Sequence, residues 1–324
     1  MYLFYYLSNK GYNICYIGTH KILYKNKVIE TNNTTLEIDK LINILKENDI
    51  YPKYIVMEVS SHGIVYGRIN CFNFHIIALT NLGSDHLDFH KNIENYHNVK
   101  INFIISSLAK FKIVPNIYKN KFNDKRNIIF YKEMNIKEKF NTISFNKDNM
   151  FLAYLILRKM KFQKLEIINN LNTIKLDNGR YQIIKHNNRN IVIDYAHHIE
   201  SFKAILDNGN FNKVVVFGCG GNRDNSKRKI MGEIASSYCK YVIITKDNSR
   251  NESLDNIIND ITSNISSYII IKDRAKAIQY ALTNYSNLDV YILGKGDEKY
   301  IIENNNFVPF NDFNCVNEII NSLK

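Results

Sequence analysis

Short runs of β-branched and aromatic residues alternate with longer segments of helical period along most of this chain of 324 residues. This alternation is typical of βα units that build a mostly parallel sheet, so it predicts an α/β fold. Strands are predicted at 14–18, 54–58, 74–80, 191–194, 213–217, 241–245, 268–271 and 290–293, and helices at 36–47, 93–108, 226–239, 254–263 and 274–285.

The length and one turn signal predict two domains. At roughly 150 residues per domain the chain has room for about two, each able to bury its own core. Asn178-Gly179 marks the boundary because both residues tolerate the positive φ of a sharp turn, and a fresh βα series begins after it. We therefore expect domains at 1–179 and 180–324. The stretch 110–147, dense in Lys and Asn, is predicted to be a variable connection or a poorly ordered excursion.

Composition indicates a folded protein of the cytoplasm. Hydrophobic residues make up 45% of the chain and charged residues 23%, which is ordinary for a soluble domain. No apolar stretch approaches the ~18 residues of a membrane span, and the N-terminal sequence MYLFYYLSNKG has no signal-peptide features. The five cysteines form no CxxC pair, which supports neither a disulfide framework nor a zinc site. We expect no membrane partner.

The net charge of +12 has two explanations. It suits an acidic partner such as nucleic acid, anionic lipid or phosphate, but AT-rich codons also favour Lys and Asn over Gly and Pro. The chain contains only 3 Pro, 13 Gly and no Trp, which favours the codon explanation. The sequence has no RNP motif, basic helix or aromatic-basic stripe, so we expect no nucleic-acid partner.

Polar loops follow four of the predicted strands in the second domain. Their sequences are DYAH (194–197), GCGGNRD (218–224), DNSR (247–250) and GKGDE (294–298). In an open parallel sheet the ligand crevice lies outside the carboxyl ends of the strands, so we expect these loops to share one site. Turn glycines or a helix cap explain each loop alone. Four together, with two arginines and paired carboxylates, suit an anionic or zwitterionic small molecule.

Two strands of the first domain lead into carboxylates and histidines. EVSSH (58–62) follows one strand, and NLGSDHLDFH (81–90) follows the next. Such groups suit a divalent ion, with Mg²⁺ preferred where phosphates complete the oxygen shell. A zinc site and a solvated turn with a capped helix remain alternatives on spacing alone.

These segments together resemble the Mur ligases, most closely the members that add the third peptide residue, usually meso-diaminopimelate, to UDP-N-acetylmuramoyl-L-alanyl-D-glutamate. The resemblance spans nearly the whole chain. It implies a Mur-ligase-like central ATPase domain, incomplete because its P-loop strand is missing, and a Rossmann-like C-terminal domain. The motifs that carry it are VMEVSSHGIVYGRI (56–69), LTNLGSDHLDFHKNIENYHNVK (79–100), FNKDNMFLAYLIL (145–157), GRYQII (179–184), VIDYAHHIESF (192–202), FGCGGNRDNSKRKIMGEIA (217–235), ITKDNSRNE (244–252) and LGKGDEKY (293–300).

The activity implied by the resemblance is ATP-dependent amide-bond formation by a monomer in peptidoglycan precursor synthesis. ATP phosphorylates the D-glutamate γ-carboxylate, and the amine of the incoming amino acid attacks the acyl phosphate. Phosphate charge shifts during this transfer, so Mg²⁺ and cationic side chains are required where the phosphates meet. The resemblance implies that Glu58 and His86 bind Mg²⁺ and that Lys100 is carbamylated beside them, a set that would serve both metal binding and catalysis.

The resemblance also implies three sets of ligand-binding residues. An arginine that ends the DNxR loop reads the distal carboxylate of diaminopimelate in the family, so Arg250 favours diaminopimelate over lysine. The incoming amino acid would meet Arg223, Asp247, Asn248, Arg250, Gly294 and Glu298. The UDP-N-acetylmuramoyl dipeptide would meet Asn33, Thr34, Thr35, Ser60 and Arg68. ATP would meet Arg180, Asp194 and His197.

The sequence departs from the family pattern in one large respect. The family has a UDP-binding domain and a Walker A loop of the type GTNGKT before the helix that residues 1–10 continue, whereas here Gly-Lys occurs only at Gly294-Lys295. We therefore expect poor binding of ATP phosphates and no turnover from residues 1–324 alone. The alternatives are a non-catalytic remnant, one piece of a split ligase, and a lysine-adding or folylpolyglutamate-type ligase. Smaller departures are Tyr66, Asn222, Ser249 and Asp297.

Overall fold

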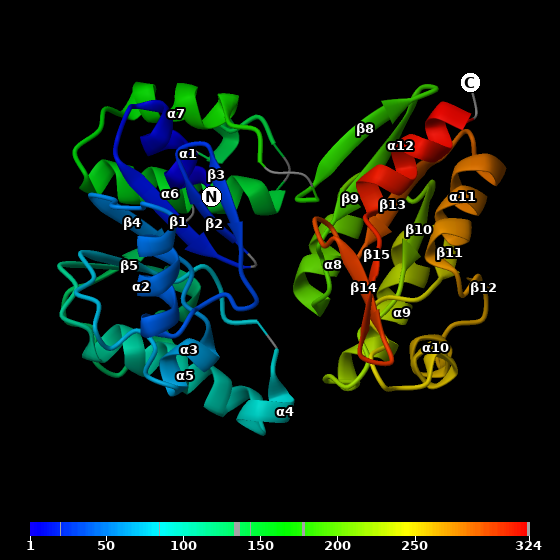
Figure 1. The fold of residues 1–324 in the computed structure, drawn as a ribbon, viewed down its shortest axis with the longest axis horizontal. Coiled ribbons are helices and arrows are strands. Elements are labelled where there is room, and N and C mark those ends of the chain that lie inside the picture. The colour runs from blue at the N-terminus through cyan, green and yellow to red at the C-terminus, as the bar shows by residue number, and fades with distance from the viewer. Residues whose placement is uncertain (20, 84, 133–136, 143, 177–178, 323–324) are drawn as a thin grey trace. The chain divides into compact units, whose positions relative to one another are not determined.

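The computed structural model describes residues 1–19, 21–83, 85–132, 137–142, 144–176 and 179–322. The chain forms two compact units (Figure 1). The first consists of Met1–Gly83 and His90–Lys175, and the second of Ser84–Phe89 and Leu176–Lys324. Of the two residues predicted to mark the domain boundary, Asn178 lies outside the described residues and Gly179 has a φ of +76°.

The second unit is built on a six-stranded sheet in the order β12-β11-β10-β13-β9-β8. Strands β12 to β9 are parallel, and β8 runs antiparallel to β9 at one edge. All strands and helices predicted after residue 180 are present. The elements are β8 (Gln182–His186), β9 (Arg189–Asp194), α8 (Ile199–Leu206), β10 (Lys213–Phe217), α9 (Ser226–Tyr238), β11 (Tyr241–Ile244), α10 (Leu254–Thr262), β12 (Ile269–Ile270), α11 (Arg274–Asn284), β13 (Asp289–Leu293), the hairpin β14 (Tyr300–Glu303) and β15 (Asn306–Pro309), and α12 (Asp312–Ser322).

The central strands of this sheet are buried on both faces. Every residue of β10 is buried, and helix α11 packs on β10, β11 and β13. A parallel strand between two helical layers has no solvent face, which explains why it is a continuous apolar run rather than an alternating one. Ile193, Val216 and Ile292 pack with Ala277 and Ala281 of α11 in one core. This core fixes the carboxyl ends of the strands, where the polar loops begin.

The first unit contains two separate sheets. One has the order β3-β2-β1-β4 and the other the order β5-β6-β7. Strand β4 is therefore an edge strand of the first sheet, and β5 is an edge strand of the second. The elements are α1 (Tyr2–Asn9), β1 (Ile14–Gly18), β2 (Lys21–Tyr24), β3 (Lys27–Glu30), α2 (Ile38–Glu47), β4 (Tyr54–Met57), α3 (Ser61–Val65), β5 (Ile76–Ala78), α5 (Ile93–Ser106), β6 (Phe111–Pro115), η1 (Asn116–Lys121), β7 (Ile128–Tyr131), η2 (Lys137–Lys139), α6 (Ser144–Lys159) and α7 (Lys164–Thr173). The short helix α4 (Leu87–His90) carries residues of both units.

The stretch 110–147 is more regular than the sequence predicts, and the expectation of a variable or poorly ordered connection is wrong for much of it. It contains the parallel pair β6 and β7 and the start of α6. Val114 is fully buried and packs with Ile77 and Phe122. The apolar runs FKIVP and IIFY are short and lie among Lys and Asn, so the composition of the stretch does not predict these two strands. Residues 133–136 and 143 lie outside the described residues.

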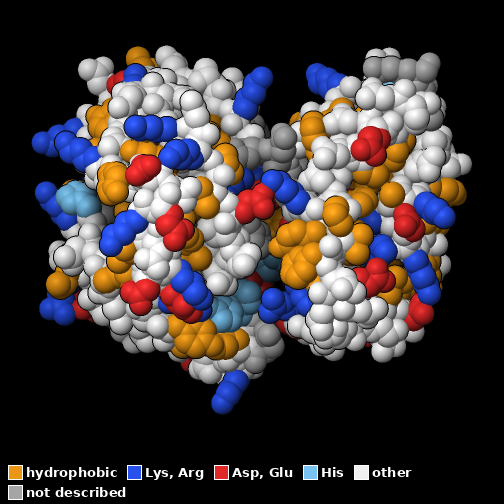
Figure 2. Space-filling model, in the orientation of Figure 1, with side chains coloured by type: hydrophobic (Ala, Val, Ile, Leu, Met, Phe, Trp, Pro, Cys, Tyr) orange, Lys and Arg blue, Asp and Glu red, His pale blue; other side chains and the backbone are white. Residues whose placement is uncertain are grey.

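The surface mixes charges of both signs. On the face shown in Figure 2, basic and acidic side chains are interspersed over both units. None of the helices in the described part of the chain has the length and apolar character needed to cross a membrane.

Candidate functional site

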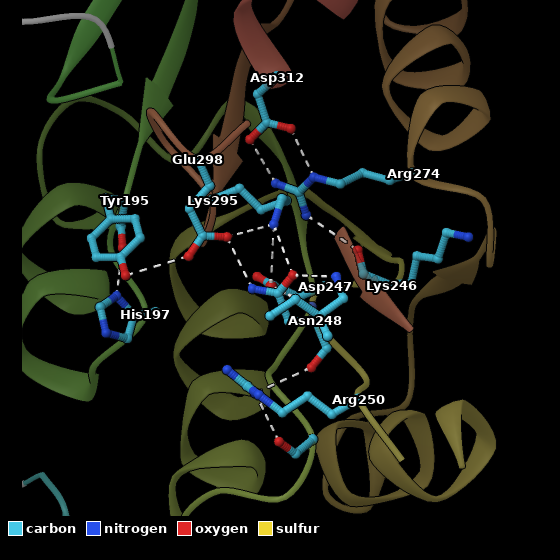
Figure 3. Close-up of polar contacts among 12 residues, drawn as sticks. Tyr195, His197, Lys246, Asp247, Asn248, Arg250, Arg274, Lys295, Glu298 and Asp312 are labelled. Atoms are coloured by element: carbon cyan, nitrogen blue, oxygen red, sulfur yellow. Dashed lines mark hydrogen bonds and ion pairs between the residues drawn. The ribbon is translucent and has the colours of Figure 1, made fainter. Parts of the chain in front are cut away.

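The four polar loops of the second unit are joined to one another by hydrogen bonds. The Gly294 amide donates to the Asp194 carbonyl at 3.1 Å, which links the loops after β13 and β9. The Gly221 amide donates to the Asn248 carbonyl at 2.8 Å, which links the loops after β10 and β11. Lys295 of the fourth loop completes the connection, because its ammonium donates to the Asn248 side chain (Figure 3). The structure therefore brings together the loops that the strand polarity predicted to share a site.

Two glycines allow these loops to approach closely. A Cβ on Gly221 would lie 2.0 Å from the Ser249 carbonyl oxygen. A Cβ on Gly294 would lie 2.7 Å from Oδ2 of Asp247, and Gly294 also has a φ of +109°, a conformation that side chains rarely adopt. A side chain at Gly221 would push the loops after β10 and β11 apart, and one at Gly294 would be strained by its φ and would displace the Asp247 carboxylate.

Lys295, Glu298 and Asn248 form the centre of the site (Figure 3). The Lys295 ammonium donates to Oε2 of Glu298 at 2.6 Å and to Oδ1 of Asn248 at 3.1 Å. The Asn248 side-chain amide donates to the same Glu298 oxygen at 2.9 Å. Oδ1 of Asp247 lies 3.8 Å from the ammonium. Burial would raise the pKa of Asp247, but the charges of Lys295 and Arg274 outweigh burial and lower it.

Arg250 points its guanidinium back toward the loop after β10. One terminal nitrogen donates to the Gly221 carbonyl at 2.8 Å and to the Asn248 carbonyl at 3.3 Å. Burial lowers the pKa of Arg250, and the charge of Arg223 adds to that effect. Arg223 itself is exposed. A half-buried guanidinium held by carbonyl groups keeps further N–H donors for a carboxylate.

The three residues assigned to ATP surround Tyr195. The Arg180 guanidinium lies over the Tyr195 ring, 4.6 Å from its centroid, and the His197 ring lies 4.4 Å from it. Asp194 accepts hydrogen bonds from the Tyr181 amide at 2.6 Å and the Ala196 amide at 2.7 Å. Burial raises the pKa of Asp194 to about 6, which these donors and Arg180 only partly offset. Burial lowers the pKa of His197, and the charges of His198 and Lys227 lower it further.

A buried ion pair holds two of the loops at the points where they leave the sheet. Arg274 of α11 and Asp312 of α12 are both fully buried and bond through two contacts of 2.7 and 2.8 Å. Arg274 also donates to the carbonyl of Leu293 at 3.0 Å and to that of Lys246 at 3.4 Å. One side chain therefore holds the end of β13 and the residue two positions after β11, where the chain enters the Lys295 and Arg250 loops.

In the first unit, Glu58 follows β4 and is bonded through both oxygens. The Tyr16 hydroxyl donates to Oε1 at 2.6 Å, and the Thr19 hydroxyl donates to Oε2 at 2.8 Å. Burial would raise the pKa of Glu58, but these hydrogen bonds outweigh it and lower the pKa. An ionised carboxylate whose hydrogen-bond donors are neutral has the chemistry of a hard-cation ligand, so Glu58 fits the predicted Mg²⁺.

The other two residues assigned to the metal have partners of their own. His86 belongs to the second unit, has a φ of +55° and lies 2.9 Å from Asp85. The Lys100 ammonium on α5 donates to the Tyr96 hydroxyl at 2.7 Å. Among the residues that the structure describes, no three His, Cys, Asp or Glu side chains form a group that could hold a metal ion. The metal set remains a prediction from the resemblance.

The residues assigned to the nucleotide-sugar peptide gather around Thr35. Its hydroxyl donates to the Glu58 carbonyl at 3.1 Å and accepts the Ser60 amide at 2.9 Å. Arg68 donates to the Thr35 carbonyl at 3.1 Å. The Thr34 and Thr19 hydroxyls lie 3.1 Å apart, and Asn33 is exposed. Thr35 itself is buried, so within this set it links the chain segments that carry its neighbours.

Sequence reasoning assigned no role to three charged residues that are buried in or beside the site. Lys295, Arg274 and Arg228 are all fully buried. Arg228 donates to both oxygens of Glu252 and to Asp260 at 2.8 Å, and it holds the loop after β10 through the Gly220 carbonyl at 3.0 Å. On a sequence, such residues resemble ordinary solvated charges. The signal that marks Lys295 is its place between two glycines directly after a predicted strand.

Comparison with known proteins assigns the chain to a family. The Mur ligase middle domain matches residues 2–191, and the glutamate ligase domain of the Mur ligases matches residues 179–296. The chain belongs to the Mur ligase family, which confirms the predicted α/β fold with a middle and a C-terminal domain and the predicted ligase class.

Individual members of the family and one solved structure are similar to this chain. The chain is 33% identical over 361 residues to UDP-N-acetylmuramoyl-L-alanyl-D-glutamate--2,6-diaminopimelate ligase 1 of Clostridium acetobutylicum, covering 98% of this chain and 74% of that one. It is 31% identical to the ligase of the same description from Caldanaerobacter subterraneus subsp. tengcongensis, covering 97% and 73%. Its fold is similar to that of a Mycobacterium tuberculosis folylpolyglutamate synthase complexed with ADP, with a TM-score of 0.69, 12% identity and coverage of 90% and 84%.

Proposed function

We propose that this chain supplies the middle and amino-acid-binding domains of a ligase that adds meso-diaminopimelate to UDP-N-acetylmuramoyl-L-alanyl-D-glutamate in peptidoglycan precursor synthesis. ATP and Mg²⁺ are the cofactors, and an acyl phosphate on the D-glutamate side chain is the intermediate. The observation that supports this most is the Arg250 loop bonded into one group with Lys295 and Glu298. Curated relatives that are 31% and 33% identical to this chain carry this activity in their names.

The charges of the second-unit site suit a zwitterionic amino acid. Diaminopimelate carries two carboxylates and two ammonium groups. Arg250 and Arg223 supply cations for a carboxylate, and planar guanidinium groups bind carboxylates through two parallel hydrogen bonds. Asp247 and Glu298 supply carboxylates for an ammonium group. The distal carboxylate is the group that distinguishes diaminopimelate from lysine, and we assign it to Arg250.

Mg²⁺ would be held by Glu58, His86 and a carbamylated Lys100, and it would offset phosphate charge during transfer. The ionised state of Glu58 supports its place in this set. In the same proposal, Arg180, Asp194 and His197 orient the nucleotide, while Thr35, Ser60 and Arg68 position the nucleotide-sugar peptide together with Asn33 and Thr34.

The test is an assay of ADP release that requires all three substrates. We expect no turnover from residues 1–324 alone, because the sequence holds no Walker A loop. A fusion that places the preceding residues of the Clostridium relative before Met1 is expected to release ADP only with the dipeptide substrate, meso-diaminopimelate and ATP. A fusion that uses L-lysine equally well would favour the lysine-adding alternative, and one with no turnover would favour a non-catalytic remnant.

The metal assignment has its own variant in the same assay. Lys100→Ala removes the group that would be carbamylated, so turnover of the fusion is expected to disappear and to return in part with an added small carboxylate. The matched control is Lys112→Ala, which removes a buried lysine that donates to the Ile105 carbonyl at 2.8 Å. Full activity of Lys100→Ala would show that this lysine is not needed for turnover.

A further inference from the structure

We propose that Lys295 is a positioning residue that holds one oxygen of Glu298 and thereby presents the other to an ammonium group of the incoming amino acid. The inference rests on the proposed function for the identity of the amino acid. Lys295 is not among the residues to which the resemblance gives a role.

The first observation is the burial of the Lys295 ammonium. Its side chain has no exposed surface, while Glu298 keeps 12% of its own. A buried ammonium is costly unless carboxylates and hydrogen-bond acceptors surround it. Lys295 meets this condition. Its ammonium nitrogen lies 2.6 Å from Oε2 of Glu298, 3.1 Å from Oδ1 of Asn248 and 3.8 Å from Oδ1 of Asp247. The cation therefore serves protein groups, and no surface of it faces a ligand.

The second observation is the unequal use of the two Glu298 oxygens. Oε2 accepts both the Lys295 ammonium at 2.6 Å and the Asn248 amide at 2.9 Å. Among the described residues, the single hydrogen-bond partner of Oε1 is the Tyr195 hydroxyl, at the long distance of 3.5 Å. A carboxylate has about four acceptor positions. Lys295 and Asn248 take those on one oxygen, which leaves Oε1 as the acceptor for a ligand.

The third observation is that Asn248 is itself fixed. Its Oδ1 accepts the Ile302 amide at 2.9 Å, which ties the loop after β11 to hairpin strand β14. Asn248 therefore cannot turn to replace Lys295 without losing this bond. With Lys295 removed, the carboxylates of Glu298 and Asp247 would face each other without the cation between them.

Lys213 offers a matched control because it is also a buried lysine. It is 2% exposed, and its ammonium donates to the carbonyls of Leu206 and Asn208. It lies at the first residue of β10, whereas the polar loops follow the last residues of the strands. Lys213→Met therefore removes a buried ammonium from the same unit and the same sheet without touching the site.

The experiment is calorimetric titration of the full chain with meso-diaminopimelate. Loss of a charge-assisted contact predicts that Lys295→Met weakens binding by about 10- to 100-fold, and Lys213→Met by less than about threefold. Glu298→Gln and the double variant complete a cycle. If Lys295 acts through Glu298, adding Lys295→Met to Glu298→Gln has little further effect, whereas a purely structural role adds its own loss.

Two results would overturn the proposal. One is binding by Lys295→Met within about threefold of the unsubstituted chain, and the other is a fully additive cycle. If the unsubstituted chain does not bind meso-diaminopimelate, the proposed function fails, and the positioning role is then decided without ligand by carbon-13 NMR of the Glu298 side-chain carboxyl group. Lys295→Met is expected to shift that signal, because Oε2 of Glu298 loses its hydrogen bond from the ammonium, whereas Lys213→Met is expected to leave it in place. An unshifted signal in Lys295→Met would refute the role.

Discussion

An ion pair of the second unit and one of the first unit differ sharply in burial. In the second unit, Arg274 and Asp312 pair with neither side chain exposed, directly below the candidate site. In the first unit, Arg126 pairs with Asp124 with the arginine side chain 87% exposed. The second unit has a continuous sheet between helical layers, whereas the first divides its strands between two sheets. A continuous parallel sheet can bury ion pairs at its carboxyl edge, and this makes the loops there rigid enough to position a ligand.

The largest contrast is expected when the two halves are expressed separately. Residues 180–324 retain the whole six-stranded sheet and are expected to fold alone as a soluble, cooperative unit. In residues 1–179, β4 and β5 are edge strands of their sheets. Tyr54 and Ile55 of β4 are 37% and 41% exposed. Open apolar edges favour aggregation, so this half is expected to be largely insoluble. Solubility and a thermal unfolding scan check both halves.

The opposite pattern, an insoluble 180–324 fragment beside a soluble 1–179 fragment, would contradict both the comparison and the proposed domain boundary.

Breaking the buried ion pair tests why the second unit can hold its loops. Arg274→Met leaves the Asp312 carboxylate buried without its partner, which is expected to lower the free energy of unfolding by about 3–5 kcal/mol. Urea unfolding of the full chain measures this change. The control is Arg126→Met, which removes the exposed pair of the first unit and is expected to leave the transition unchanged. Equal effects of the two substitutions would show that burial of the pair does not matter.

Asp194 makes the stability of the second unit depend on pH. Its pKa is about 6 in the folded protein against an ordinary value of 3.8, so the folded state retains the proton longer than the unfolded state. The stability that this group contributes is complete below about pH 4 and is lost as the pH rises through about 6. A shift of this size corresponds to about 3 kcal/mol.

The measurement is urea unfolding between pH 4 and pH 7 for the unsubstituted chain and for Asp194→Asn. Subtracting one curve of unfolding free energy against pH from the other cancels the contribution of the other carboxylates. The free energy of unfolding of the unsubstituted chain is expected to fall relative to that of Asp194→Asn as the pH rises. A difference that does not change with pH would refute the raised pKa.

Sequence and structure agree best where one segment alone determines the outcome. The strands of the second unit are predicted because a run such as KVVVF must be buried on both faces, and the loops that follow them are placed by strand polarity. The pair β6 and β7 is missed because its runs are short and surrounded by Lys and Asn. Lys295 is missed for a different reason, since its burial depends on Asn248 and Glu298, which only the fold brings together.

The assigned roles of Glu58, His86 and Lys100 come from resemblance, because neither spacing nor composition distinguishes a metal set from a capped turn. The structure gives each of them a protein partner, and the metal set stays a prediction.

The most direct test of the central claim is the affinity of the full chain for meso-diaminopimelate and for L-lysine, measured by calorimetry with and without Arg250→Ala. If Arg250 binds the distal carboxylate, the unsubstituted chain prefers diaminopimelate, and Arg250→Ala reduces that preference by about 1.5–3 kcal/mol, with little change for lysine. Equal affinity of the unsubstituted chain for both amino acids, or an unchanged preference in Arg250→Ala, would contradict the account.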